Sequence, residues 1–192
     1  KWIWSTYLVL TIACILSYYV AGMGLFDSFN YAMTTTATGG FSTHNTSTEF
    51  FHSPSLEYIC TFFCFLSGVN FTLLYAAVIK FKIKELFRNS EFRFYIFLVT
   101  VFSIFIMVEL MVMRNYDIEH AFRSAIFQVV SFITTTGLFN DDAALWPHVT
   151  WVVLSMCMFI GACSGSTSGG LKCIRGVILL RIVKNEFRQI LH

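Results

Sequence analysis

The sequence predicts an all-helical integral membrane protein built from two tandem repeats. Of its 192 residues, 56% are hydrophobic and only 12% are charged, whereas soluble domains average about 25% charged residues. Apolar runs of membrane-spanning length recur along the chain, and a Thr/Gly-rich stretch occurs twice beside them. The formal net charge of +2 is small, and no basic patch alternates with exposed aromatic residues, so nucleic-acid binding is not indicated.

Four apolar segments are predicted to cross the membrane, because about 20 apolar residues suffice for one crossing. They lie at residues 7–23, 56–79, 94–113 and 150–163, and the last of them resumes at 171–183. We therefore expect three continuous spanning helices and a fourth that is interrupted.

Two shorter helical segments, at residues 25–37 and 119–134, contain polar residues and are too short to cross. Each stops at a Thr/Gly run, which reads "MTTTATGGFSTH" at 33–44 and "FITTTGLFND" at 132–141. We expect both helices to enter the membrane and end inside it, as re-entrant pore helices do.

The distribution of charge predicts the orientation, because basic residues favour the cytoplasmic ends of membrane helices. No Lys or Arg occurs in residues 24–57, and the later Thr/Gly run is followed by two aspartates, although two arginines weaken that contrast. We therefore expect the Thr/Gly runs to face outside and the basic ends to face the cytoplasm. The basic ends contain Lys80, Lys82, Lys84, Arg88 and Arg93, then Arg181, Lys184 and Arg188; the later outer loop contains Asp141, Asp142, Arg114 and Arg123.

The chain also repeats itself. Placing Gly40 against Gly137, 97 residues later, aligns the Thr/Gly runs, and "SEFRFY" resembles the later "NEFRQI". Each copy consists of a spanning helix, a short helix, a Thr/Gly loop, a second spanning helix and a basic end. We predict one pore repeat at residues 1–88 and another at 89–192.

The Thr/Gly runs have the composition of an ion-selective loop. Non-helical backbone inside a bilayer persists only where it is buried in protein or lines water. Its carbonyl oxygens can replace the hydration shell of an alkali cation, and glycine permits the backbone conformations that this requires. The carboxyl end of each short helix, with about half a negative charge, also favours a cation. The alternative is that these small residues only pack helices together; two runs in equivalent places favour the ion-selective loop.

A third unusual stretch, "GACSGSTSGGLKCIR" at 161–175, interrupts the last apolar segment. Gly161, Gly165 and Gly169 stand at the spacing of a helix-packing motif. However, glycine is a poor helix former and serine is an indifferent one, so we favour a kink or a re-entrant loop that gates by moving. The two cations that follow would form an electrostatic barrier or bind a cytosolic partner.

No residue pattern in the chain indicates an enzyme. His44 and His52 lie in a polar loop with neither a nucleophile nor a carboxylate pair nearby. The six cysteines lie in or beside apolar runs without CxxC spacing, as lipid-buried thiols do.

Together these motifs resemble the middle of a TrkH-type subunit of the Trk/Ktr/HKT superfamily of potassium transporters. The resemblance rests on "AGMGLFDSFNYAMTTTATGGFSTHNTS", "FLSGVNF", "NSEFR", "FQVVSFITTTG" and "GACSGSTSGGLKCIR", and it covers essentially the whole chain. Family members have four such repeats around one pore, and this chain resembles the second and third. It starts "KWIWSTYLVL", without an initiator methionine or a signal cleavage site, so we expect a segment of a longer polypeptide.

The resemblance implies roles for individual residues. Gly40 and Gly137 would be the filter glycines, and an intramembrane gate loop would lie below them. The other filter carbonyls or hydroxyls would come from Ala37, Thr38, Gly39, Thr134, Thr135 and Thr136. The gate loop would contain Gly161, Ser164, Gly165, Ser166, Thr167, Ser168, Gly169 and Gly170, followed by the cations Lys172 and Arg175.

The resemblance also implies that K⁺ is the transported ion, without a covalently bound cofactor. Full-length subunits of the family form homodimers in the membrane lipid and bind a cytosolic TrkA-type nucleotide-binding ring, and two further repeats of the same polypeptide would complete the pore. Leu138 and Ala162 depart from the family pattern, but both filter glycines are present, which favours potassium over sodium. The alternatives are a sodium-conducting member, a non-transporting scaffold, and a two-repeat protein that dimerises; passive conduction and symport are both open.

Overall fold

The computed structural model describes residues 2–78, 83–141 and 145–190. Over these residues the chain is helical and contains no strand, which confirms the predicted all-helical class. Three charges used to predict the orientation, Lys80, Lys82 and Asp142, lie outside the described residues. The elements are α1 (Trp2–Val20), α2 (Leu25–Ala37), η1 (Ser47–Phe51), α3 (Pro54–Ser67), α4 (Phe71–Val78), α5 (Ile83–Arg88), α6 (Ser90–Arg114), α7 (Ile118–Ile133), α8 (His148–Ile160) and α9 (Cys173–Ile190).

Two of the described helices, α1 and α6, are long and apolar enough to cross a membrane by themselves. They coincide with the predicted segments 7–23 and 94–113. Asn89 starts α6 as its N-cap, because its side-chain oxygen accepts the backbone N–H groups of Glu91 and Phe92 at 2.8 and 3.2 Å.

The predicted segment 56–79 is not one continuous helix, so the prediction that only the last segment is interrupted is wrong. α3 and α4 meet at 108° across a Gly-Val-Asn sequence. Gly68 lies in a tight contact, since a Cβ there would stand 2.6 Å from a tyrosine hydroxyl. Asn70 starts α4, because its Oδ1 accepts the N–H of Thr72 at 2.9 Å. The local capping and close packing outweigh the apolar continuity of the sequence.

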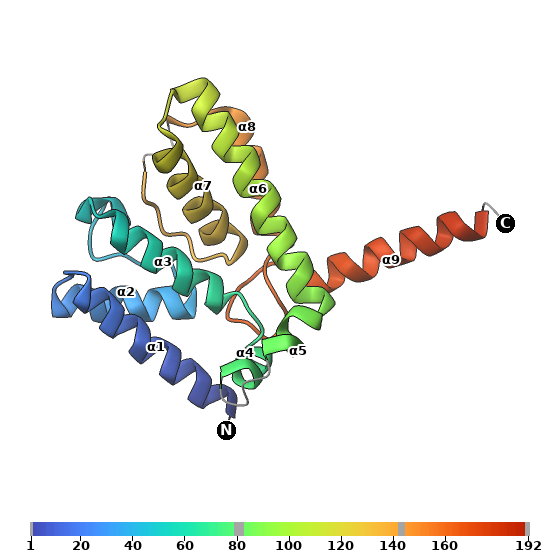
Figure 1. Ribbon diagram of the computed structural model, residues 1–192, viewed down its shortest axis with the longest axis horizontal. Coiled ribbons are helices and arrows are strands. Elements are labelled where there is room, and N and C mark those ends of the chain that lie inside the picture. The colour runs from blue at the N-terminus through green and yellow to red at the C-terminus, as the bar shows by residue number, and fades with distance from the viewer. Residues whose placement is uncertain (1, 79–82, 142–144, 191–192) are drawn as a thin grey trace.

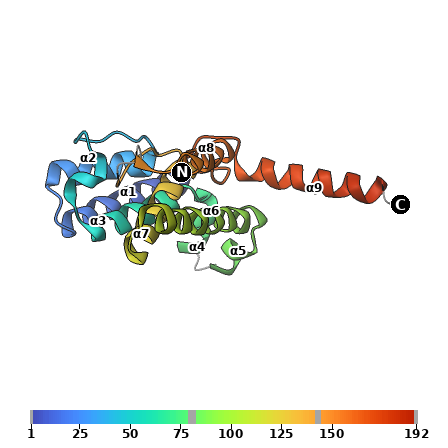
Figure 2. The ribbon, with the colours of Figure 1, turned by 90° about the horizontal axis from the view of Figure 1, so that it is seen from above.

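The interruption predicted in the last segment is present, as a loop of residues 161–172 between α8 and α9. Its ends lie against each other, since a Cβ on Gly170 would stand 2.8 Å from the Cα of Gly161, and both glycines have positive φ angles of 79° and 72°. The glycines of this loop are not on a helix, so GxxxG helix packing does not explain them. α9 packs against α6 and then projects away from the other helices (Figures 1 and 2).

The helices form two groups of three with the same internal contacts. α1, α2 and α3 pack against one another, and so do α6, α7 and α8. α3 also packs against α7, and this contact joins the two groups (Figure 1). The largest fully buried side chains include Tyr18 and Tyr31 in the first group and Tyr95, Phe127 and Ile133 in the second. This packing brings the C-terminal ends of α2 and α7, and the Thr/Gly runs that follow them, together at the junction of the two groups.

Candidate functional site

The first Thr/Gly loop begins where α2 ends, at Thr38. This residue has φ 53° and ψ 45°, a left-handed conformation that costs a non-glycine residue roughly 1 kcal/mol. The N–H of Gly39 donates to the carbonyl of Thr34 at 2.8 Å, and the N–H of Phe41 donates to the Thr34 hydroxyl at 2.8 Å. Gly40 lies between them with φ 75°, where glycine is favoured. Thr34 therefore anchors the backbone of the loop.

The second Thr/Gly loop has the same construction, 97 residues later. Thr135 has φ 55° and Gly137 has φ 81°. The N–H of Thr136 donates to the carbonyl of Ser131 at 2.8 Å, and the Ser131 hydroxyl donates to the carbonyl of Leu138 at 2.8 Å. The offset that aligns the two glycines in the sequence therefore also aligns the backbone turns and the anchoring hydroxyl residues.

The two loops meet at Gly40. A Cβ on Gly40 would stand 2.2 Å from the carbonyl oxygen of Thr136, so only glycine allows the two backbones to approach this closely. Gly137 differs, because apart from its chain neighbours no described atom lies within 4 Å of its Cβ position. The loop carbonyls that accept no hydrogen bond from any described residue are those of Thr38, Gly39, Gly40, Thr134, Thr135, Thr136 and Gly137.

The side-chain hydroxyls at the predicted filter positions are already bonded within the protein. The Thr134 hydroxyl donates to a carbonyl of its own helix at 2.7 Å. The Thr38 hydroxyl donates to the carbonyl of Ala37, the last residue of α2, at 2.7 Å. The Thr135 hydroxyl oxygen accepts a backbone N–H of the 161–172 loop at 2.7 Å. The Thr38 and Thr134 hydroxyls donate their protons in these contacts and keep lone pairs on oxygen, so these hydroxyl oxygens and the backbone carbonyls can both face an ion.

The 161–172 loop lies against both Thr/Gly loops. The Thr167 hydroxyl donates to the carbonyl of Thr36 at 3.0 Å, and the Thr167 carbonyl accepts the hydroxyl of Thr38 at 3.0 Å. On the other side, the N–H of Gly169 donates to the Thr135 hydroxyl oxygen. The structure thus brings the predicted filter and gate residues into direct contact.

The two cations predicted to act beside this loop have different environments. The Lys172 ammonium group donates to the carbonyl of Ser168 and lies 3.4 Å from the Ser168 hydroxyl, which is itself 2.7 Å from the Ser166 hydroxyl. Arg175 is exposed on the first turn of α9. The structure therefore places the Lys172 charge on the loop itself and the Arg175 charge outside it.

The sequence analysis gave no role to Glu91, which anchors the same loop. Glu91 is only 4% exposed. One of its carboxylate oxygens accepts the backbone N–H of Ser164 at 2.5 Å, and the other accepts the Ser164 hydroxyl at 3.0 Å. The "NSEFR" sequence was used only for the family resemblance, and nothing in it pointed to a contact 73 residues away.

A buried ion pair near the second Thr/Gly loop was also missed. The carboxylate of Glu57 lies 3.2 Å from the Arg123 guanidinium and accepts the side-chain N–H of Asn140 at 2.6 Å. Arg123 also bonds Glu119 at 3.1 Å. The Glu119–Arg123 pair has the i,i+4 spacing that a helical pattern makes visible, whereas Glu57 lies on a different helix and could be placed only by the fold.

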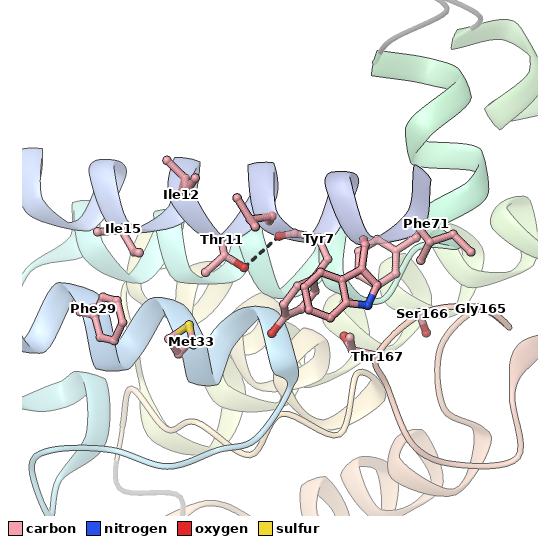
Figure 3. A pocket seen from close by; sticks show the side chains of 13 residues that line it. Tyr7, Thr11, Ile12, Ile15, Phe29, Met33, Phe71, Gly165, Ser166 and Thr167 are labelled. Atoms are coloured by element: carbon pink, nitrogen blue, oxygen red, sulfur yellow. Dashed lines mark hydrogen bonds between the residues drawn. The ribbon is translucent and has the colours of Figure 1, made fainter. Parts of the chain in front are cut away.

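An apolar groove of about 790 Å³ runs along α1 and α2 and reaches the 161–172 loop. Figure 3 shows Phe29 and Met33 of α2 and Ile12 and Ile15 of α1 along its length, with Thr167 at its end. Phe29 and Met33 remain 53% and 43% exposed.

Comparison with known proteins identifies the whole chain with one family model. The model described as TrkH, cation transport protein, matches residues 1–192. The Trk system potassium uptake protein TrkH of Halomonas elongata is 35% identical over 192 residues, which are 100% of this chain and 40% of that protein. The Trk system potassium uptake protein TrkG of Escherichia coli is 38% identical over 190 residues, which are 99% of this chain and 39% of that protein.

The fold has a close counterpart among solved structures. The crystal structure of the potassium transporter TrkH from Vibrio parahaemolyticus matches with a TM-score of 0.93 and 37% sequence identity, over 98% of this chain and 41% of that one. This match confirms the all-helical membrane class predicted from composition and, separately, the resemblance to the TrkH family. A transport family agrees with the prediction that the chain is not an enzyme. The chain spans about two fifths of the length of the relatives that it matches.

Proposed function

Because the chain belongs to the TrkH family of cation transport proteins, we propose that it forms part of a potassium uptake pathway across the cytoplasmic membrane. K⁺ passes inward through a filter built partly from the backbone carbonyls of residues 36–41 and 133–138. The observation that carries this proposal is that the two loops meet beside carbonyl groups that no described residue pairs. Carbonyl oxygens that no other group of the protein pairs can replace the water around a cation.

The short helices support a cation over an anion. α2 and α7 contain 13 and 16 residues, or about 20 and 24 Å at 1.5 Å per residue, which is less than the roughly 30 Å of a hydrocarbon core. Each ends at its Thr/Gly loop, so the partial negative charge of about half an electron at the helix end is directed at the ion. The ligands are neutral, which suits a monovalent ion that must also leave.

The remaining wall of the pore comes from parts of the polypeptide beyond this chain. The α3 helix covers one face of α7, whereas the corresponding face of α2 lies in the open groove of Figure 3. Residues 1–88 and 89–192 then act as two pore repeats, with two further repeats completing the filter and covering the groove. The full-length subunits form homodimers and bind a TrkA-type nucleotide-binding ring at their cytoplasmic face, and the Thr/Gly loops face outside.

The proposal is tested by replacing each filter glycine with serine in the full-length polypeptide that contains this chain. Gly40→Ser forces a side chain into the Thr136 carbonyl, and Gly137→Ser strains a backbone at φ 81°. We expect K⁺ over Na⁺ discrimination, measured as bi-ionic flux in liposomes, to fall about tenfold or more, since about 1.4 kcal/mol of lost differential binding has that effect.

Gly22→Ser is the matched control, because Gly22 also has a positive φ, of 103°, but lies between α1 and α2, away from both loops. Selectivity that is unchanged in all three variants supports a scaffold whose glycines only pack helices. A wild-type protein that prefers Na⁺ supports the sodium-conducting alternative.

A further inference from the structure

The segment that follows the second Thr/Gly loop is bonded to the first half of the chain. The N–H of Phe139 donates to the Ser47 hydroxyl at 3.1 Å, and its carbonyl accepts the N–H of Thr48 at 3.0 Å. Ser47 and Thr48 belong to the short η1 helix, more than 90 residues earlier. The exit from the second loop is therefore fixed across the junction between the two helical groups.

Asn140 makes the most extensive of these contacts. Its side-chain N–H groups donate to Glu57 at 2.6 Å and lie 3.4 Å from the Ser124 hydroxyl, and its side-chain oxygen accepts from Gln128 at 3.3 Å. Asn140 is 6% exposed and Gln128 is fully buried. The amide is thus held between α3, which supplies Glu57, and α7, which supplies the other two partners.

The Glu57 carboxylate lies beside a cationic side chain. Arg123 lies 3.2 Å from it and also binds Glu119. A hydrogen bond to a charged acceptor is shorter and roughly twice as strong as a neutral one, and the 2.6 Å contact to Asn140 has the length expected of that class. A cleft of about 240 Å³ is lined by Glu57, Arg123 and Asn140.

Within the described residues, the segment directly after the first Thr/Gly loop, residues 41–44, makes its hydrogen bonds inside its own half of the chain. At the position 97 residues before Asn140, the Thr43 hydroxyl donates to Asp27 at 2.6 Å. Asp27 occupies the place on α2 that Ser124 occupies on α7, so both post-loop segments bond to the same position of their own short helix. Thr43 is exposed, and its partner lies in the same half of the chain. The hydrogen bond between Asn140 and Glu57 therefore has no equivalent at Thr43 among the described residues.

The two filter glycines also differ in what supports them. Gly40 is packed against the Thr136 carbonyl, whereas the Cβ position of Gly137 faces open space within the described part of the chain. Asn140 is only three residues from Gly137, so a fixed Asn140 limits the positions open to that glycine.

We propose that Glu57 and Asn140 are positioning residues for selectivity: their hydrogen bond holds the second filter loop in register with the first. This inference rests on the proposed function and deepens it. The bond does not touch the ion; it fixes the backbone that does.

The test uses Asn140→Ala in the full-length polypeptide, because this change removes the link to Glu57 and leaves the Glu57–Arg123 ion pair intact. The K⁺/Na⁺ permeability ratio in liposomes is expected to fall about tenfold, equivalent to about 1.4 kcal/mol. Thr43→Ala, the matched change after the first loop, is expected to alter the ratio by less than about twofold, since exposed bonds contribute little.

A second variant separates charge from shape. Glu57→Gln keeps an oxygen that accepts the Asn140 N–H but replaces the carboxylate, so we expect a smaller fall in the K⁺/Na⁺ permeability ratio than in Asn140→Ala. If Glu57→Gln alone lowers the amount of folded protein, the double variant with Arg123→Gln is expected to restore it. A ratio equal to wild type in Asn140→Ala, with altered selectivity in Gly137→Ser, overturns the positioning role alone. A ratio unchanged in both variants overturns the filter and the positioning role with it.

Discussion

Helices α3 and α8 occupy corresponding positions in the two groups, but the chain continues differently after each. A tight bend follows α3, and a long loop follows α8. Only the Gly68–Asn70 sequence separates α3 from α4, whereas residues 161–172 separate α8 from α9. The bend is filled: a Cβ on Gly68 would stand 2.7 Å from a methyl group of Thr134 and 3.1 Å from the Cβ of Ala162. The longer loop is linked to the Thr/Gly loops mainly by hydrogen bonds.

This difference separates a fixed support from an element that can move. Three hydrogen bonds join the 161–172 loop to the two Thr/Gly loops, through Thr167 and Gly169. At about 1 kcal/mol net for each bond, moving residues 166–169 away from the Thr/Gly loops costs a few kcal/mol, whereas residues 161–165 are held further by bonds to Gly68, Phe71 and Glu91. The bend has no comparable alternative, because moving it breaks a close-packed contact.

Shortening the loop is expected to have the largest effect. Deleting Ser166 to Ser168 removes the Thr167 contacts with both the filter backbone and α3. Conductance is expected to change about tenfold or more while assembly is retained, since the two Thr167 bonds to the Thr/Gly loops contribute about 2 kcal/mol. Single-channel or flux recordings in liposomes measure the first quantity, and size-exclusion chromatography of the detergent-solubilised protein measures the second.

Gly68→Ala at the bend is the contrasting variant. It places a methyl group on the Tyr95 hydroxyl, so it is expected to lower the amount of folded protein by overpacking, which costs about 1–3 kcal/mol. The distinction between a movable loop and a fixed bend would be lost in either of two cases. One is normal gating after the loop deletion, and the other is altered gating in Gly68→Ala without loss of folded protein.

The sequence predicted the features that depend on local composition. The apolar lengths of α1 and α6 identify them as spanning helices, and the Ser/Gly content of 161–170 marks the break after α8. The offset between Gly40 and Gly137 locates two loops that the fold builds alike. In each case the signal lies within about 25 consecutive residues or in a direct repeat.

The features that were missed depend on contacts between distant residues. The bend after α3 was hidden because a single glycine costs a helix only about 1 kcal/mol, and the deciding contacts at Gly68 come from Tyr95 and Thr134. Glu57 and Glu91 each bind a residue more than 70 positions away. Their sequence neighbours resemble ordinary helix starts, which favour acidic residues for electrostatic reasons.

Glu91→Gln is expected to have the next largest effect, because it weakens the anchor at the start of the loop. The change converts two charge-assisted bonds to Ser164 into neutral ones, a loss of about 1–2 kcal/mol, and the open probability of the pore is expected to shift by about fivefold to thirtyfold. Glu186→Gln on the exposed surface of α9 is the control for loss of a negative charge. Equal effects of the two variants would mean that net charge, and not the Ser164 anchor, controls the loop.

Lys172→Gln is expected to have the smallest effect of the three. The ammonium group donates to the Ser168 carbonyl from a partly exposed position, so its contribution is mainly electrostatic, about 1 kcal/mol or less. Conductance is expected to change by about threefold at low ionic strength and by less at about 1 M salt, where the Debye length falls to about 3 Å. Arg175→Gln, one turn further from the loop, is expected to change it less. An effect of Lys172→Gln that is independent of salt would show that the lysine acts through its bond to Ser168 and not as a barrier charge.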